Sequence, residues 1–184
     1  MKTIILLILL TASLPSAAQG VFSNQTTAAL QKVIQDYPNR FLNIRGDRIQ
    51  EHDHSIEYAS KVRIPGSLHC VVTEANTAAV AFGWTCNLFQ TTDPQKARDK
   101  FQELFNQIRN TIIKIEGAKP FILNGDYEQP SADALQAVIQ FRFVPATTQV
   151  RNLKVTLTLQ YQEEWTIVLD VFETAPAETA VAAP

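Results

Sequence analysis

Six segments of this chain alternate apolar and polar residues, and this alternation constrains the fold more than any other feature. The segments are Ile56–Ile64, Leu68–Val72, Ala78–Leu88, Leu135–Phe143, Leu153–Tyr161 and Trp165–Val171. Successive side chains of a β-strand point to opposite faces, so each segment predicts a strand with one face on a core. A solvated second face is typical of antiparallel sheets. We therefore expect a fold rich in antiparallel sheet.

Two further segments have the spacing of an amphipathic helix. Apolar residues recur at i, i+3, i+4, i+7 and i+11 in Leu30–Phe41 and again in Phe101–Ile112. The first helix is predicted near Asn24–Tyr37 and ends before Pro38, because proline disfavours helical geometry at the residue before it. The second is predicted to end before Gly117.

The start of the second helix carries two competing signals. Asp93 can cap the helix, with Pro94 in its first turn. Alternatively, Thr92 and Gln95 can form a capping box. Both alternatives place the first helical turn at the same point of the chain.

The two halves of the chain resemble each other. The helical segments lead into similar exits that end at Gly46 and Gly117, an offset of 71 residues. Further on, Trp84–Leu88 is similar to Trp165–Leu169 at an offset of 81 residues. We interpret the similarity as an internal duplication, with the extra residues of the second half in the loop Gly125–Asp133.

These patterns predict an α+β fold made of two tandem units, each a helix followed by three or four antiparallel strands. Residues 19–90 form the first unit and residues 91–172 the second, within one compact body. The two units are expected to pack together or to share one sheet. Residues 173–184 have almost no large apolar side chain and are expected to form a flexible tail.

Residues 1–18 have the pattern of a cleavable signal peptide. Lys2 precedes a short run of isoleucine and leucine, and the small residues Ser16 and Ala18 mark a cleavage site. The apolar run is too short to span a bilayer, which takes about 20 residues. We therefore expect an extracytoplasmic protein, secreted or periplasmic, with no membrane span in the mature chain.

Cys70 and Cys86 are the only cysteines, and an even number in an exported chain favours a disulfide. Both lie at inward-facing positions of predicted strands. A tight turn at residues 75–77 would leave them too far apart, whereas a wider loop centred near Ala78 would place them opposite each other. Disulfide and two buried thiols both remain open at this point.

The loop Gly125–Asp133 is our candidate contact region, because it most breaks the similarity of the halves and loops on rigid scaffolds often bind partners. Asp126, Tyr127 and Glu128 are its candidate contact residues. His52 and His54 have metal-ligand chemistry, but a polar connection between strands explains them better, since zinc needs further ligands. No metal site is predicted.

The chain has a formal net charge of −2 and no basic stripe, which argues against nucleic-acid binding. No catalytic or cofactor motif is present, so no cofactor is predicted and an enzyme is disfavoured. The leading hypothesis is an exported non-catalytic protein that binds a protein or peptide through sheet edges or the loop. The alternatives are an extracytoplasmic carrier of a small apolar ligand, and a hydrolase-type enzyme whose residues converge only in space.

Overall fold

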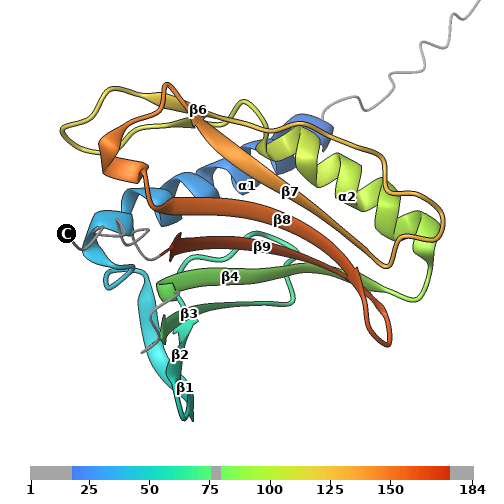
Figure 1. Cartoon of the computed structure of the whole chain (residues 1–184), viewed down its shortest axis with the longest axis horizontal. Coiled ribbons are helices and arrows are strands. Elements are labelled where there is room, and N and C mark those ends of the chain that lie inside the picture. Colours follow the sequence, from blue (N-terminus) through green and yellow to red (C-terminus); the bar gives the residue numbers. More distant parts are fainter. Residues whose placement is uncertain (1–17, 76–79, 175–184) are drawn as a thin grey trace, which may run out of the picture.

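The computed structural model describes residues 18–75 and 80–174. Within these residues, nine strands form one antiparallel sheet in the order β1-β2-β3-β4-β9-β8-β7-β6-β5, and two α-helices lie on one of its faces (Figure 1). The elements are α1 (Ala18–Gln35), η1 (Tyr37–Asn39), β1 (Arg45–His52), β2 (Ser55–Ser60), β3 (His69–Ala75), β4 (Val80–Thr91), α2 (Pro94–Ile108), β5 (Ile112–Ile113), β6 (Phe121–Asn124), β7 (Gln136–Val144), η2 (Thr148–Val150), β8 (Leu153–Tyr161) and β9 (Trp165–Thr174).

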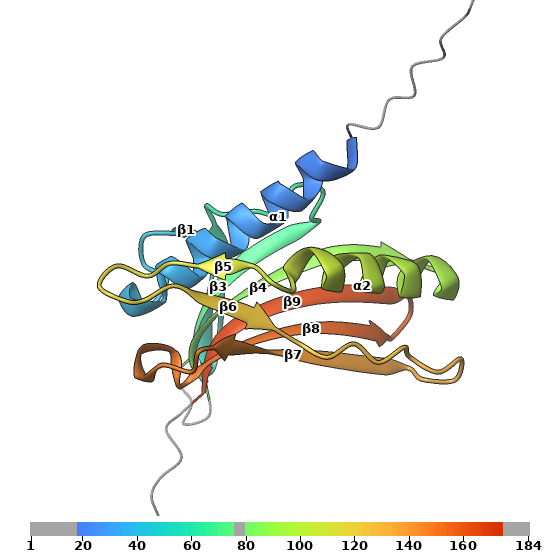
Figure 2. The same cartoon turned by 90° about the horizontal axis from the view of Figure 1, so that it is seen from above.

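The single sheet corrects the predicted fold class, because the chain does not fold as two tandem helix-plus-sheet units. β4 and β9 pair along the middle of the sheet, from Val80↔Thr174 to Thr91↔Trp165. Hydrogen bonding therefore continues across the point where a boundary between units was expected, and both helices cover one shared core (Figure 2). The similarity of the two halves at the sequence level stays a prediction. The expected signal peptide lies almost entirely outside the described residues.

The predicted alternation is clearest in the central strands. In β8 and β9 every second residue is buried from Leu153 to Leu159 and from Trp165 to Val171. These side chains face the helices and join one core with Phe41, Phe101 and Trp84, all fully buried. The opposite face of the sheet, here called the outer face, carries partly exposed residues such as the threonines of β8. No helix within residues 18–75 and 80–174 is long and apolar enough to cross a bilayer.

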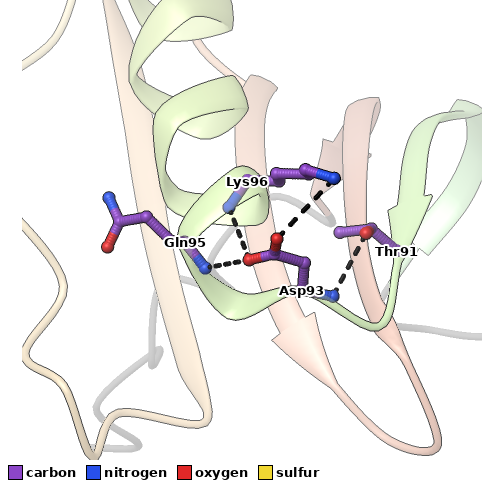
Figure 3. Close-up of polar contacts among 4 residues, drawn as sticks. All are labelled: Thr91, Asp93, Gln95 and Lys96. Atoms are coloured by element: carbon purple, nitrogen blue, oxygen red, sulfur yellow. Dashed lines mark hydrogen bonds and ion pairs between the residues drawn. The ribbon is translucent and has the colours of Figure 1, made fainter.

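The N-terminus of α2 is capped by Asp93 rather than by Thr92, as Figure 3 shows. The Asp93 Oδ1 atom accepts hydrogen bonds from the backbone N–H groups of Lys96 at 3.1 Å and Gln95 at 2.9 Å. The hydrogen bond from Lys96, with smaller contributions from Gln95 and the Lys96 charge, lowers the pKa of the Asp93 carboxyl. The Thr91 hydroxyl accepts from the Asp93 N–H at 3.1 Å and fixes the entry to the helix.

A disulfide joins Cys70 to Cys86, so the wider-loop alternative is confirmed. The two residues are directly opposite each other in β3 and β4, with Cα atoms 4.0 Å apart. Both are buried on the face that packs against the helices. Residues 76–79, which contain the centre of that loop, lie outside the described residues.

Replacing both cysteines, Cys70→Ala with Cys86→Ala, is expected to lower the free energy of unfolding by about 3 kcal/mol, because the bond closes a loop of 16 residues in the unfolded chain. Guanidinium unfolding of the parent and the double variant measures this loss. Reductant should move the parent curve onto that of the variant. Mass spectrometry that finds two free thiols in the unreduced parent would contradict the assignment.

Trp84 is the largest fully buried side chain and has one polar atom to satisfy. Its indole N–H donates to the Ser60 hydroxyl at 2.9 Å, and that hydroxyl donates in turn to the Val62 carbonyl at 2.7 Å. The hydrogen bonds connect the middle of the sheet to the end of β2. They also explain why Ser60, a polar residue, is buried.

The substitution Ser60→Ala should lower the free energy of unfolding by about 1–3 kcal/mol, because it leaves the buried N–H of Trp84 without an acceptor. Chemical denaturation followed by tryptophan fluorescence measures the change. Ser55→Ala, in the same strand but only partly buried, is the matched control and should change stability by less than about 0.5 kcal/mol. Equal effects of the two substitutions would contradict a role for the Trp84 hydrogen bond.

Candidate functional site

Strand β7 (Gln136–Val144) is paired on only one side over most of its length. β8 pairs with it from Gln136 to Phe141. On the other side, β6 pairs only with Arg142–Val144, because β6 is four residues long. In the described part of the chain no strand lies beside Gln136–Phe141 on that side. We call this stretch the open edge.

The hydrogen-bond pattern identifies the backbone groups that face outward at the open edge. The Leu135 carbonyl accepts from the Tyr161 N–H at 2.9 Å, so Leu135 directs its backbone toward β8. Backbone direction alternates along an antiparallel strand, which directs Ala137 and Ile139 toward β8 as well. The residues whose N–H and C=O groups face away from β8 are Gln136, Val138 and Gln140.

Gly125 explains why β6 stops where it does. A Cβ atom at this position would lie 3.0 Å from Cδ1 of Phe141 and 3.3 Å from Cγ2 of Ile139. Both side chains are buried on the inner face of the sheet. The backbone therefore leaves the plane of the sheet at Gly125 and crosses over these inner side chains, an approach so close that any side chain at this position would crowd Phe141 and Ile139.

Residues 125–135, here called the strap, connect β6 to β7 along the side of α2 (Figure 2). The Tyr127 ring packs against Phe105 and Phe101, with centroid distances of 5.2 and 6.3 Å. Burial, and secondarily the charge of Asp99, raises the pKa of the Tyr127 hydroxyl. The Arg98 guanidinium donates to the Ala132 carbonyl at 2.7 Å and holds the far end of the strap on the helix.

A groove of about 680 Å³ lies between the strap and the open edge, and we call it the slot. It is lined by Asp126, the strap residues 128–131, the β7 residues 136–140 and Arg142. Neighbouring residues of a strand point to opposite faces, so contact with five consecutive residues means that the slot follows the edge of β7. At one end Asp126 forms an ion pair with Arg142 at 2.8 Å.

The three contact residues predicted in the loop occupy different surroundings. Asp126 and Glu128 are exposed and line the slot. Tyr127 instead packs toward the core and anchors the strap. The outward backbone groups of Gln136 and Gln140 were not found from the sequence. The available signal was a difference in length: the apolar segment Phe121–Asn124 is shorter than the strand that follows it, and a glycine lies between the two. This difference indicates that part of the longer strand has no neighbour on that side.

The remaining candidates lie elsewhere. His52 ends β1 and His54 is in the turn to β2, both exposed. In residues 18–75 and 80–174, no three His, Cys, Asp or Glu side chains come together as metal ligands would. Cys70 and Cys86 are joined to each other and brace β3 against β4.

The outer face of the sheet holds a second groove, of about 530 Å³, over β1 to β4. Thr85 lines it and donates a hydrogen bond to the Asp170 carboxylate of β9 at 2.7 Å. Burial raises the pKa of the Asp170 carboxyl, and the Thr85 hydrogen bond opposes this only in part. Asp170 is thus a half-buried carboxyl in the middle of the outer face.

Asp170→Asn is expected to stabilise the protein at pH 7. The pKa of Asp170 is higher in the folded protein than its value of about 3.9 in the unfolded chain. The contribution of this carboxyl to the free energy of unfolding is therefore full below about pH 3.9, and it is lost as the pH rises through the folded pKa. The gain from the substitution should therefore disappear at low pH. Urea unfolding at several pH values measures it, with the exposed Asp47→Asn as control. A gain that is independent of pH would contradict the burial of the charge.

Comparisons with protein-family models, with curated proteins and with solved structures find no match for this chain. What the slot does is therefore inferred from its own geometry and chemistry.

Proposed function

We propose that this is an exported, non-catalytic binding protein that takes an extended segment of a partner polypeptide as an additional strand on β7. The supporting observation is the open edge, where Gln136, Val138 and Gln140 direct their backbone groups into the slot. An extended polypeptide presents its own N–H and C=O groups with the same two-residue repeat, about 6.6 Å. Strand addition of this kind takes its affinity from backbone hydrogen bonds and its specificity from alternate side chains.

The other edges of the sheet are less suited to a partner strand. Natural proteins protect exposed edges with charged side chains or with very short edge strands. β1 carries Arg48 and Glu51, joined as an ion pair, along with other charged residues. β5, at the opposite end of the sheet, has only two residues. By contrast, Gln136–Phe141 carries no charge, and Val138 is 55% exposed.

The strap favours binding in the slot over random association at the edge. Its contacts with Phe105 and Arg98 hold it in place before a partner arrives. Because the strap is already ordered, less conformational entropy is lost when a partner binds. An incoming segment would lie beside β7 and in line with the end of β6, and the strap would lie beneath it.

Export is the remaining part of the proposal. Residues 1–18 carry the signal-peptide pattern. The buried bond between Cys70 and Cys86 is of a kind that persists in oxidising compartments outside the cytoplasm. Both features support a protein that meets its partner in the periplasm or after secretion.

The variant Val138→Pro tests strand addition directly. Proline removes one outward N–H and blocks the approach of a partner strand, yet it leaves the bonds from β7 to β8 in place. We expect a capped twelve-residue peptide of alternating threonine and valine to shift the amide resonances of Gln136, Val138 and Gln140 in the parent protein. Val138→Pro should lower its affinity at least about tenfold, the loss expected for one to two hydrogen bonds.

Val138→Ala is the matched control, since it keeps the N–H and removes only side-chain atoms. Its affinity for the peptide should stay within about threefold of the parent value. Resonance shifts confined to β1, or equal binding by the proline and alanine variants, would contradict strand addition at β7. Thermal unfolding of each variant checks that the fold is retained.

A further inference from the structure

We infer that the segment taken by the slot is cationic, with lysine or arginine at alternate positions. This inference rests on the proposed function and adds the class of partner. It follows from the charges that line the slot, where Asp126 and Arg142 pair with each other and Glu128 is left without an ion pair among the described residues.

The strap itself is acidic. Between Phe121 and Phe141 the chain has three acidic residues and no basic one. Of the three, Asp126 is paired with Arg142. Within residues 18–75 and 80–174, neither Glu128 nor Asp133 forms an ion pair, and both are exposed.

Two further carboxylates lie beyond the other end of the slot, in the β8–β9 hairpin. Gln136, where the open edge begins, is directly opposite Gln160 of β8. The β8–β9 hairpin follows, and it carries Glu163 and Glu164 next to the Tyr161 that bonds to Leu135. A partner strand along β7 would therefore run from Glu128 toward these two carboxylates.

The one basic side chain that lines the slot is already paired. The Arg142 guanidinium is held by the Asp126 carboxylate at 2.8 Å, which leaves Glu128 as the slot-lining charge without an ion pair among the described residues. Lysine or arginine on the partner would supply the missing positive charge. Since side chains alternate along an added strand, one set would face the strap and Glu128, and the other would lie beside Val138 on the outer face.

A second copy of this chain is a poorer occupant of the slot. Pairing two open edges would bring two acidic straps together, and like charges brought into contact are unfavourable. An acidic or neutral segment would likewise gain nothing from Glu128. Charge complementarity thus favours a basic extended segment over these alternatives.

Three dye-labelled, capped peptides of twelve residues test the inference by fluorescence anisotropy on the full chain. Valine occupies every second position, and the others are lysine, glutamine or glutamate. We expect the lysine peptide to bind at least about tenfold more tightly than the glutamine peptide, and the glutamate peptide more weakly than both. Raising the salt concentration should reduce the advantage of lysine.

Glu128→Gln should weaken binding of the lysine peptide by about two- to fivefold and leave the glutamine peptide unchanged. Glu57→Gln, on β2 at the other side of the sheet, is the matched control and should change neither affinity. Because Glu128 is exposed, neither variant is expected to disturb the fold.

The possible outcomes separate the two proposals. Equal binding of the lysine and glutamine peptides, abolished for both by Val138→Pro, would overturn the charge inference and leave strand addition standing. Binding of the lysine peptide that Val138→Pro does not affect would mean attraction to surface charge alone, and would overturn both. A parent protein that is dimeric without peptide, and monomeric as Val138→Pro, would show that a second copy occupies the edge and would also overturn the inference.

Discussion

The pairing of β4 with β9 is the interaction on which the rest of the structure depends. These long strands lie in the middle of the sheet and join the strands of the first half to those of the second. On the inner face they contribute Trp84, Leu169 and Val171 to the core that both helices cover. The pairing places the two ends of the sheet far apart (Figure 1). Because both helices occupy the inner face, the outer face and the edges remain for contact with other molecules.

The open edge of β7 results from packing rather than from a missing strand. At Gly125 the chain approaches Ile139 and Phe141 so closely that it leaves the sheet, and Tyr127 then fixes it against α2. The same backbone thus covers the core beneath β7 and leaves the edge above uncovered. The change of chain direction at Gly125 therefore has two consequences: Tyr127 is packed against α2 as an anchor, and the backbone groups along the edge of β7 stay accessible. The stability of the strap and its proposed role in binding thus depend on the same feature.

Sequence reasoning predicted the local features well. Alternation located the central strands and their buried faces, and Asp93 was among the predicted caps of α2. The disulfide depended on a register with two alternatives, which only the pairing of β3 with β4 decides. The division into two tandem helix-plus-sheet units was wrong. The sequence left open whether the halves share one sheet, because pairing between β4 and β9 joins residues some eighty positions apart and leaves no local pattern. β1, β5 and β6 were missed too, since edge strands are short or exposed and carry little alternation.

The candidate site was predictable only in part, because some of its features depend on contacts between distant parts of the chain. Composition predicted the loop Gly125–Asp133 as a contact region, and its residues Asp126 and Glu128 line the slot. Contact of these residues with a partner stays a prediction. Composition could not show that Tyr127 turns inward, because an aromatic residue in a loop is compatible with either direction. Nor could it identify Gln136 and Gln140, since their contribution comes from backbone groups and depends on which neighbouring strand is absent.

Amide hydrogen exchange of the free protein, read residue by residue along β7, tests the central claim most directly. An edge that is open on one side predicts slow exchange at Ala137 and Ile139, whose N–H groups face β8, and fast exchange at Gln136, Val138 and Gln140. Slow exchange at all five amides would mean that the edge is already covered, and would contradict the account.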